Sequence, residues 1–307
     1  ELGVTRYPYF EGSYAMRGSS VYQQTLNLTI SEKQKLRRLL EENYLPKNRV
    51  YRYNFFYDNC TTRARDIIEK CIEGKVVYSE GKERLSFRDI VHQYTKGHEW
   101  DELGIDMCLG SEADKPIDTR KQMFAPFYML EAAKKATIVV GDSVRPLILH
   151  EKKVVDVEPE DVREGFPLSP MVCVFILIGV TCFVGWLQFK IRKIIWIWDL
   201  LLFGVQGLAG CVITFLVFFS THPTVGSNWL ILLLNPIPLI YLPVMVYRAI
   251  KGKKDYYHTI NIVCLTSFMM IMPFIQQKFN VTVLPLALCL LICSANHVLL
   301  YYRQNNK

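Results

Sequence analysis

The sequence has 307 residues, of which 50% are apolar and 21% charged, and its mean hydropathy is +0.14, which is high for a soluble enzyme of this length. Residues from Phe166 onward carry ten Lys and Arg against two Asp and Glu, whereas the preceding part carries 26 against 27. The net charge of +7 therefore belongs to the apolar half and gives no support for a nucleic-acid partner, whose binders gather basic residues on one folded face. Gly-rich phosphate loops and nucleotide motifs are absent as well, so we expect no cofactor.

The polar half predicts a mixture of helices and strands. Residues 19–29, "SSVYQQTLNLT", alternate and are rich in β-formers, which predicts a strand. A helix is expected from residue 30 to 45, with Ser31 and Gln34 spaced as a capping box. The aromatic run 49–57, "RVYRYNFFY", predicts a second strand, and residues 85–95 predict a helix that Ser86 and Asp89 begin.

Between these elements, "CTTRARDIIEKCIEG" predicts a short helix that starts at Cys60. Asp58 or Asn59 is expected to cap it, and Gly74 to close it. The first turn of a helix stabilises a thiolate through its unpaired N–H groups and the helix dipole, and Arg63 and nearby Arg65 act in the same direction. A strand, a sharp turn and a cysteine at a helix N-terminus are the layout of papain-like nucleophiles.

Two other interpretations of Cys60 stay open at this point. Cysteine is among the most buried residue types, and an oxidising compartment would allow a disulfide. If a bridge exists, we expect it between Cys71, on the apolar side of its helix, and Cys108, in the segment "DMCLGS", for which we expect no regular structure.

The apolar half contains five stretches long enough to cross a bilayer, at about 168–189, 195–219, 229–247, 257–277 and 281–302. Trp196 and Trp198 place the start of the second span among the headgroups, so we expect Asp199 to be interfacial rather than part of a proton relay. In the third span, Asn235, Pro236 and nearby Pro238 predict a broken helix. Such a break is tolerated only beside protein or a cavity, which suggests a lipid or acyl pocket near it.

Lys and Arg are concentrated in the connections after the first and third spans and in the C-terminal tail. The two opposite loops contain only Lys278. Because cytoplasmic loops hold the excess of basic residues, the polar half is predicted to lie outside the cytoplasm. We accordingly expect an extracytoplasmic catalytic domain at 1–150, a charged connector at 151–167 and a membrane domain at 168–307. An exported domain needs a targeting segment, and "ELGVTRYPYF" is not one, so we expect residues upstream of Glu1.

Three parts of the sequence carry a resemblance: "YNFFYDNCTTRARD" around Cys60, "THPTVGSNWLILLLNP" at 221–236, and the five-span tail. Together they are similar to the Lnb family of bacterial lipoprotein N-acyltransferases. The "NC" that opens a helix also resembles the permuted papain-like acyltransferases of the lecithin retinol acyltransferase type. The resemblance implies an α+β papain-like outer domain, N-terminally incomplete here, followed by an α-helical five-span membrane domain.

The resemblance also implies a reaction and a place. An acyl chain would pass from a membrane phospholipid to Cys60 as a thioester, and then to the α-amino group of the lipidated N-terminal cysteine of a diacylglyceryl-modified lipoprotein. The protein would be a multi-pass protein of the bacterial cytoplasmic membrane, with its N-terminal domain on the periplasmic side. Asn59 and Asp58 would shape the site of the nucleophile, and an Arg63–Asp66 pair would order the turn.

The family's general base should be a His that precedes the cysteine, and no His occurs between Glu1 and Cys60. We expect the base upstream of Glu1. His92, inside a helix, is expected to be structural, and His297 to be packed or hydrogen-bonded between helices. His222, in a loop on the outer side, is expected to have a supporting role. The Cys and His residues lack the spacing of a metal site.

Alternative interpretations remain for the aromatic residues and for the function. Tyr7, Tyr9, Phe10, Tyr53 and Phe55–Tyr57 are interpreted as the core of a small sheet, with an acyl groove or headgroup contact as the alternative. A membrane-anchored papain-like hydrolase of the cell envelope is the first rival function, although it would not need five spans. A non-enzymatic sensor or transporter is the second, and sparse intramembrane charge speaks against it.

Overall fold

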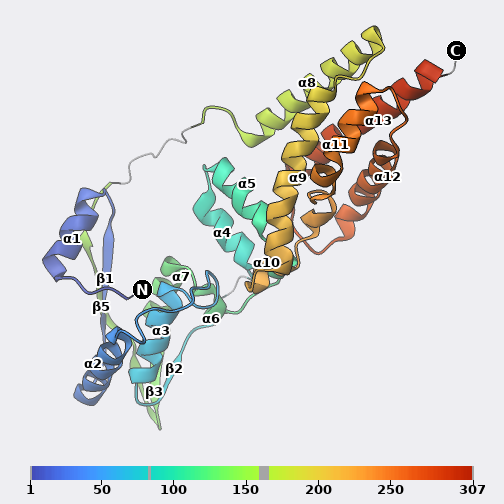
Figure 1. Cartoon of the computed structure of the whole chain (residues 1–307). Helices are drawn as coiled ribbons and strands as arrows, with labels where there is room; N and C mark the ends of the chain where they lie inside the picture. Colours follow the sequence, from blue (N-terminus) through green and yellow to red (C-terminus); the bar gives the residue numbers. More distant parts are fainter. Residues whose placement is uncertain (1, 82–83, 159–165, 306–307) are drawn as a thin grey trace. The chain divides into compact units, whose positions relative to one another are not determined.

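The computed structural model describes residues 2–81, 84–158 and 166–305, which group by their contacts into two units (Figure 1). The sheet unit consists of the described residues of Glu1–Ile90 and Pro116–Arg163. The bundle unit consists of those of Val91–Lys115 and Glu164–Lys307. The short segment 91–115 therefore groups with the apolar helices, although it lies in the polar half of the sequence.

Small antiparallel sheets and short helices build the sheet unit. Its helices are α1 (Tyr7–Met16), α2 (Ile30–Tyr44), α3 (Cys60–Cys71), α6 (Thr119–Gln122) and α7 (Pro126–Lys135), and α4 (Phe87–Thr95) begins in it. Its strands are β1 (Val21–Leu26), β2 (Lys75–Val77), β3 (Thr137–Val140), β4 (Ser143–Pro146) and β5 (Ile148–Val155). β1 pairs with β5, and β3 lies between β2 and β4. The chain is thus still part of a sheet at Val155, inside the predicted connector.

Helix starts in the sheet unit follow local sequence signals. The helix expected from residue 30 is α2, but its capping box is formed by Thr29 and Glu32, two residues earlier along the chain than the predicted pair. Ser31 instead donates a hydrogen bond to Glu73 Oε1. The Ser86–Asp89 start of α4 is confirmed. The Ser86 hydroxyl donates a hydrogen bond to the Asp89 carboxylate and accepts one from the Asp89 N–H.

The strand predicted at 49–57 is wrong. That segment is irregular, with a single isolated bridge between Asn54 and Asp58. Aromatic residues favour strands because they fit a pleated, half-buried surface, and no strand among the described residues pairs with this segment to supply that surface. Phe56 alone is buried, whereas Tyr53 and Phe55 are about half exposed.

Two small cores hold the sheet unit together. Phe56 packs against Phe87 and Phe124, with ring centroids 4.5 and 5.1 Å away. The other core lies between α2, α3, α7 and the sheets and includes Cys71, Ile138 and Leu147. The core prediction for the aromatic residues therefore holds for Phe56 but is wrong for the exposed ones, which are Tyr7, Tyr9, Tyr53, Phe55 and Tyr57.

The bundle unit contains the five predicted spans. They are α8 (Pro170–Ile191), α9 (Trp196–Phe218), a composite of α10 (Pro223–Gly226), the 3-10 helix η2 (Trp229–Leu232) and α11 (Ile237–Ile250), then α12 (Tyr256–Ile271) with η3 (Met272–Phe274), and α13 (Val283–Asn305). All five are long and apolar enough to cross a membrane. Figure 1 shows α9 running beside α11, and α13 beside α8 and α12.

The break predicted in the third span is present and is covered by protein. The chain leaves helical structure before Pro236, and Asn235 Oδ1 accepts the N–H of Ile237, at the start of α11. Gln206 Nε2 donates to the freed carbonyl of Leu233 at 2.8 Å. Gly210 of α9 lies so close to the break that an added Cβ would collide with the Asn235 backbone. The interrupted backbone is therefore satisfied by α9 rather than by lipid.

The segment 91–115 forms α5 (Glu99–Cys108) and η1 (Ser111–Asp114) and is bonded to the loops of the bundle. Asn228 Nδ2 donates to the carbonyl of Met107 at 2.7 Å, and Gln277 Nε2 donates to that of Leu109 at 3.2 Å. Cys108 is the last residue of α5 rather than part of an unstructured segment. Cys71 and Cys108 are both free thiols.

Candidate functional site

Cys60 is the first residue of α3, and its side chain is exposed. The helix forms here because Asn59 takes an extended conformation and caps it, so the Asn59 prediction is confirmed and Asp58 is not the cap. Cys60 Sγ lies 4.0 Å from the hydroxyl of Thr61. Among the described residues, no imidazole forms a hydrogen bond with this sulfur. The thiol is thus held at a fixed helix start and is open to solvent.

Asn59 fixes that helix start with four hydrogen bonds from a buried side chain. Its Oδ1 accepts the N–H groups of Thr61 and Thr62, at 2.9 and 2.8 Å. Its Nδ2 donates to the carbonyls of Phe55 and Phe124, at 2.9 and 2.8 Å. The amide therefore ties the first turn of α3 both to the aromatic segment before it and to a segment 65 residues away. The backbone that carries the Cys60 thiol is therefore held in place.

Arg63 lies beside the cysteine but does not pair as predicted. Its guanidinium donates two hydrogen bonds to Asp58, at 2.7 and 2.8 Å, and lies 3.5 Å from the centre of the Tyr51 ring. Asp66 instead accepts hydrogen bonds from Arg65 and Arg120. The expected Arg63–Asp66 pair is therefore wrong, because the side chains at the two positions turn to different partners.

The pKa values of two tyrosine phenols are affected by Cys60. Burial raises the pKa of Tyr53, and the neighbouring Cys60 raises it further. Burial also raises the pKa of Tyr51, an effect that the positive charge of Arg63 opposes and that Cys60 supports. Exposed Phe55 adds an apolar surface to the same segment. The surroundings of Cys60 combine aromatic faces with one firmly held cation, which suits a substrate with an apolar chain and a polar head.

Histidines of the bundle unit have well-defined surroundings. His92 Nε2 lies 2.8 Å from Oδ1 of buried Asp106, whose other oxygen accepts a hydrogen bond from Asn280. Asp106 was missed by the sequence analysis, since nothing in its local pattern marks it. His222 occupies the N-cap position of α10 in the loop between α9 and η2, but its side chain does not cap the helix.

An apolar groove of about 390 Å³ runs along the bundle unit. Leu177, Leu202, Leu234 and Leu290 line it, together with Met107 of α5. It therefore adjoins the broken third span, where the sequence analysis suggested a lipid or acyl pocket. Two buried polar atoms of lining residues, Trp198 Nε1 and Gln206 Oε1, have no hydrogen-bond partner among the described residues. A groove of this composition is complementary to a hydrocarbon chain.

Two family models match the chain. The model of the Lnb N-terminal periplasmic domain matches residues 1–96, and that of the Lnb transmembrane domain matches residues 161–305. No curated protein and no solved structure matches it. The periplasmic domain and the five spans agree with the fold class and the orientation expected from the sequence. The chain therefore belongs to the Lnb family, as a periplasmic α+β domain followed by a five-helix transmembrane domain.

Proposed function

We propose that the protein is a lipoprotein N-acyltransferase that uses Cys60 as its nucleophile. The observation that carries the proposal is the exposed thiol of Cys60 at the rigidly capped start of α3, within the periplasmic domain of an Lnb-family chain. The donor is a phospholipid, and the acceptor is a diacylglyceryl-modified lipoprotein. The excess of basic residues in alternate loops supports placement in the bacterial cytoplasmic membrane.

The first half-reaction forms a thioester. The Cys60 thiol loses its proton and the thiolate attacks the ester carbonyl of the phospholipid. The tetrahedral intermediate collapses with cleavage of the C–O bond, and the leaving lysophospholipid alkoxide takes up one proton, which balances the proton lost by the thiol. The N–H groups of Thr61 and Thr62 are already taken by Asn59. We therefore assign the N–H of Cys60 itself, rather than the whole first turn, as the backbone donor of the oxyanion hole.

The second half-reaction transfers the acyl chain. The free α-amino group of the lipoprotein's lipidated cysteine attacks the thioester carbonyl, the C–S bond breaks as an amide forms, and the proton lost by the nitrogen returns to the Cys60 thiolate. Asn59 is a positioning residue, since it acts through the turn that carries the thiol. Asp58 and Arg63 hold the segment before α3 in the same way, and Asp66 anchors α3 to Arg120. For His222 we propose a supporting role in its loop on the outer, periplasmic face of the cytoplasmic membrane.

The apolar groove of the bundle unit supports a lipid substrate. A methylene group fills about as much space as a water molecule, about 30 Å³, so the groove's 390 Å³ accommodates a long acyl chain. Neither rival function accounts for such a groove. A peptidase or amidase of the cell envelope would need a polar cleft, and a sensor needs no exposed thiol.

Intact mass spectrometry after incubation with phospholipid tests the proposal. We expect a mass gain of one acyl group that neutral hydroxylamine removes and that Cys60→Ser abolishes. Cys182→Ser, which removes another exposed thiol on α8, should retain the adduct. If the folded protein forms no adduct while Cys60 reacts with a small thiol reagent, the acyltransferase proposal fails and the hydrolase is favoured.

A second pair of variants tests the groove. Ala209→Trp fills it, so the adduct should form more slowly or with shorter chains. Leu208→Trp changes the adjacent, exposed residue of α9 and should leave the adduct unchanged. Equal rates in the two variants would show that the acyl chain does not enter this groove.

A further inference from the structure

A cluster of metal-ligand side chains lies inside the bundle unit, on helices α9 and α13. Asp199, Cys293 and His297 are all buried, with 0%, 3% and 5% of their surfaces exposed. His297 Nε2 lies 2.8 Å from Asp199 Oδ2, and Cys293 Sγ lies 3.5 Å from Asp199 Oδ1. One ligand atom from each residue lies within 4.8 Å of those of the other two.

The spacing of these residues explains how they meet. Cys293 and His297 are four positions apart on α13, so they lie on one face of the helix. Asp199 faces them from the first turn of α9. Asp199 is fully buried and lies against His297 of α13. The sequence alone does not reveal this site, because a Cys–His pair four positions apart is too short a pattern to identify one.

His258 on α12 supplies a second, independent observation. It is fully buried, and its ring stacks on that of His297 with centroids 3.8 Å apart. Its Nδ1 contacts the Ser294 hydroxyl, whereas its Nε2 has no hydrogen-bond partner among the described residues. An imidazole nitrogen left unpaired in a buried site is costly unless it meets an ion or a water molecule.

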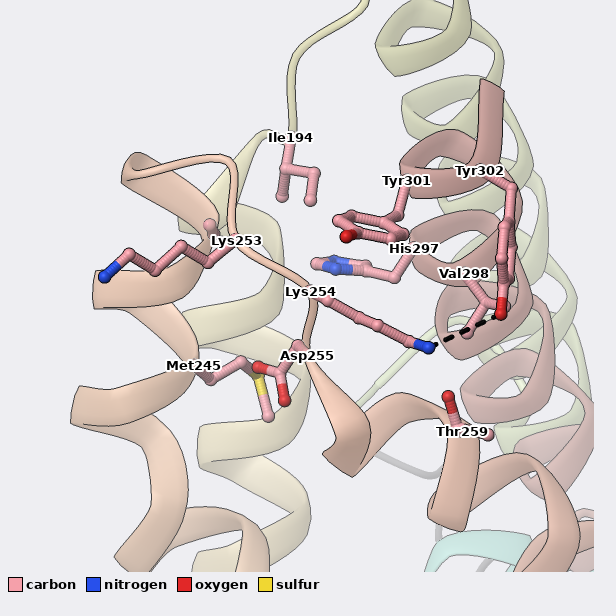
Figure 2. Close-up of a pocket in the computed structure, with 11 residues that line it drawn as sticks. Ile194, Met245, Lys253, Lys254, Asp255, Thr259, His297, Val298, Tyr301 and Tyr302 are labelled. Carbon is pink, nitrogen blue, oxygen red and sulfur yellow. Dashed lines mark hydrogen bonds between the residues drawn. The ribbon is translucent and has the colours of Figure 1, made fainter. Parts of the chain in front are cut away.

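The cluster can be approached through a small cavity at the end of the bundle. Figure 2 shows His297 among its lining residues, with Lys254 and Asp255 of the loop between α11 and α12. The cavity has a volume of about 20 Å³, which is enough for a water molecule or a small ion. This loop is on the side that the basic residues assign to the cytoplasm.

We propose that Asp199, Cys293 and His297 bind a divalent transition-metal ion, with Zn²⁺ as the best fit to one carboxylate, one thiolate and one imidazole. On binding, the Cys293 S–H bond breaks and its proton leaves to solvent, while bonds form from the metal to sulfur, oxygen and nitrogen. The two negative ligands balance the two charges of the ion. A neutral site of this kind is favoured inside an apolar bundle, where an isolated carboxylate is expensive.

Such a site would fasten α9 to α13 beside α12. It goes beyond the proposed acyl transfer, because neither Cys60 nor the apolar groove takes part in it. Its failure would therefore leave the proposed function untouched, and the reverse also holds.

Co²⁺ titration of the full chain in detergent, after treatment with a chelator, tests the proposal. We expect one Co²⁺ per chain and a thiolate-to-cobalt charge-transfer band in the near ultraviolet. Cys293→Ser should remove the band and weaken binding by at least about tenfold, and Asp199→Asn should weaken binding as well. Cys289→Ser is the matched control, since Cys289 is buried on the same helix and contacts Thr181.

Size-exclusion chromatography identifies the variants that fold, and only these are compared. A folded wild-type chain without the band would overturn the metal site and leave a plain Asp199–His297 hydrogen bond. Equal Co²⁺ binding by Cys293→Ser and Cys289→Ser would overturn it too. Thermal unfolding gives a second readout, since Co²⁺ should raise the melting temperature of the wild type and not that of Cys293→Ser.

Discussion

Replacing Asn59 by Ala should loosen the start of α3 and with it the position of the Cys60 thiol. The substitution removes a helix cap, which costs about 1 kcal/mol. It also leaves the Phe55 and Phe124 carbonyls without the donor they have now, and the bond to Phe124 is buried. With a penalty of about 1–3 kcal/mol for an unpaired buried group, the local cost is about 2–4 kcal/mol.

Hydrogen–deuterium exchange of the full chain in detergent measures this local cost. At 2 kcal/mol, the amides of Thr61 and Thr62 should exchange about thirtyfold faster. Asn59→Ser keeps a capping oxygen but loses both donated bonds, so its effect should be smaller than that of Asn59→Ala. Thr29→Ala removes the cap of α2 and should leave α3 unchanged.

The reasoning would be refuted if Asn59→Ala left the exchange of Thr61 and Thr62 unchanged in a folded chain. If Asn59→Ser and Asn59→Ala had the same effect, the cap would contribute nothing, and the donated bonds alone would hold the turn. The first result would also mean that the start of α3 does not hold Cys60 rigidly, whereas the second would leave Cys60 positioned by the donated bonds.

Three further predictions concern other parts of the chain. Buried Glu32 bonds Arg145 at 2.6 Å, and although burial acts in the other direction, the N–H donors and Arg145 lower its pKa. Its stabilisation of α2 is therefore complete above the ordinary carboxyl pKa of about 4.3 and is lost as pH falls through the lower folded value, which hydrogen exchange at α2 measures. Gly210→Ala should lower the melting temperature in detergent by several degrees, at about 1–3 kcal/mol for overpacking, whereas Gly204→Ala, which meets nothing within 4 Å, should not. Cys71 should resist a thiol reagent until the chain unfolds, because burial raises its pKa and hides it, as peptide mass mapping would show.

Each of these predictions has an opposite outcome that is easy to recognise. A Glu32→Gln chain that loses α2 protection with the same pH profile as the wild type would place the titration elsewhere. Equal melting temperatures for the Gly210 and Gly204 variants would mean that the break in the third span is not packed tightly on α9. Rapid labelling of Cys71 in the folded chain would contradict its burial.

Hydrophobic length and capping signals were readable in the sequence because they are local. A span needs only a continuous apolar run that matches the bilayer, and the five runs became the five helices. A cap needs only one polar side chain beside a helix start, and Asn59 provides it. The break at Asn235 and Pro236 was local as well, since proline lacks the N–H that would continue the helix.

Everything that depends on a distant partner was decided by the tertiary structure. The run 49–57 has the composition of a strand, but within the part of the chain that the structure describes no strand pairs with it. Arg63 donates its hydrogen bonds to Asp58 rather than to Asp66, because the chain before α3 folds back onto the helix. Asp199 and His297 are 98 residues apart, and only helix packing brings them together. The sequence thus determined which segments are helical and which cross the membrane, because these properties follow from residues close in the chain. Packing decided which polar side chains meet. Buried polar groups need hydrogen-bond partners, and only the packed fold brings those partners together from residues far apart in the sequence.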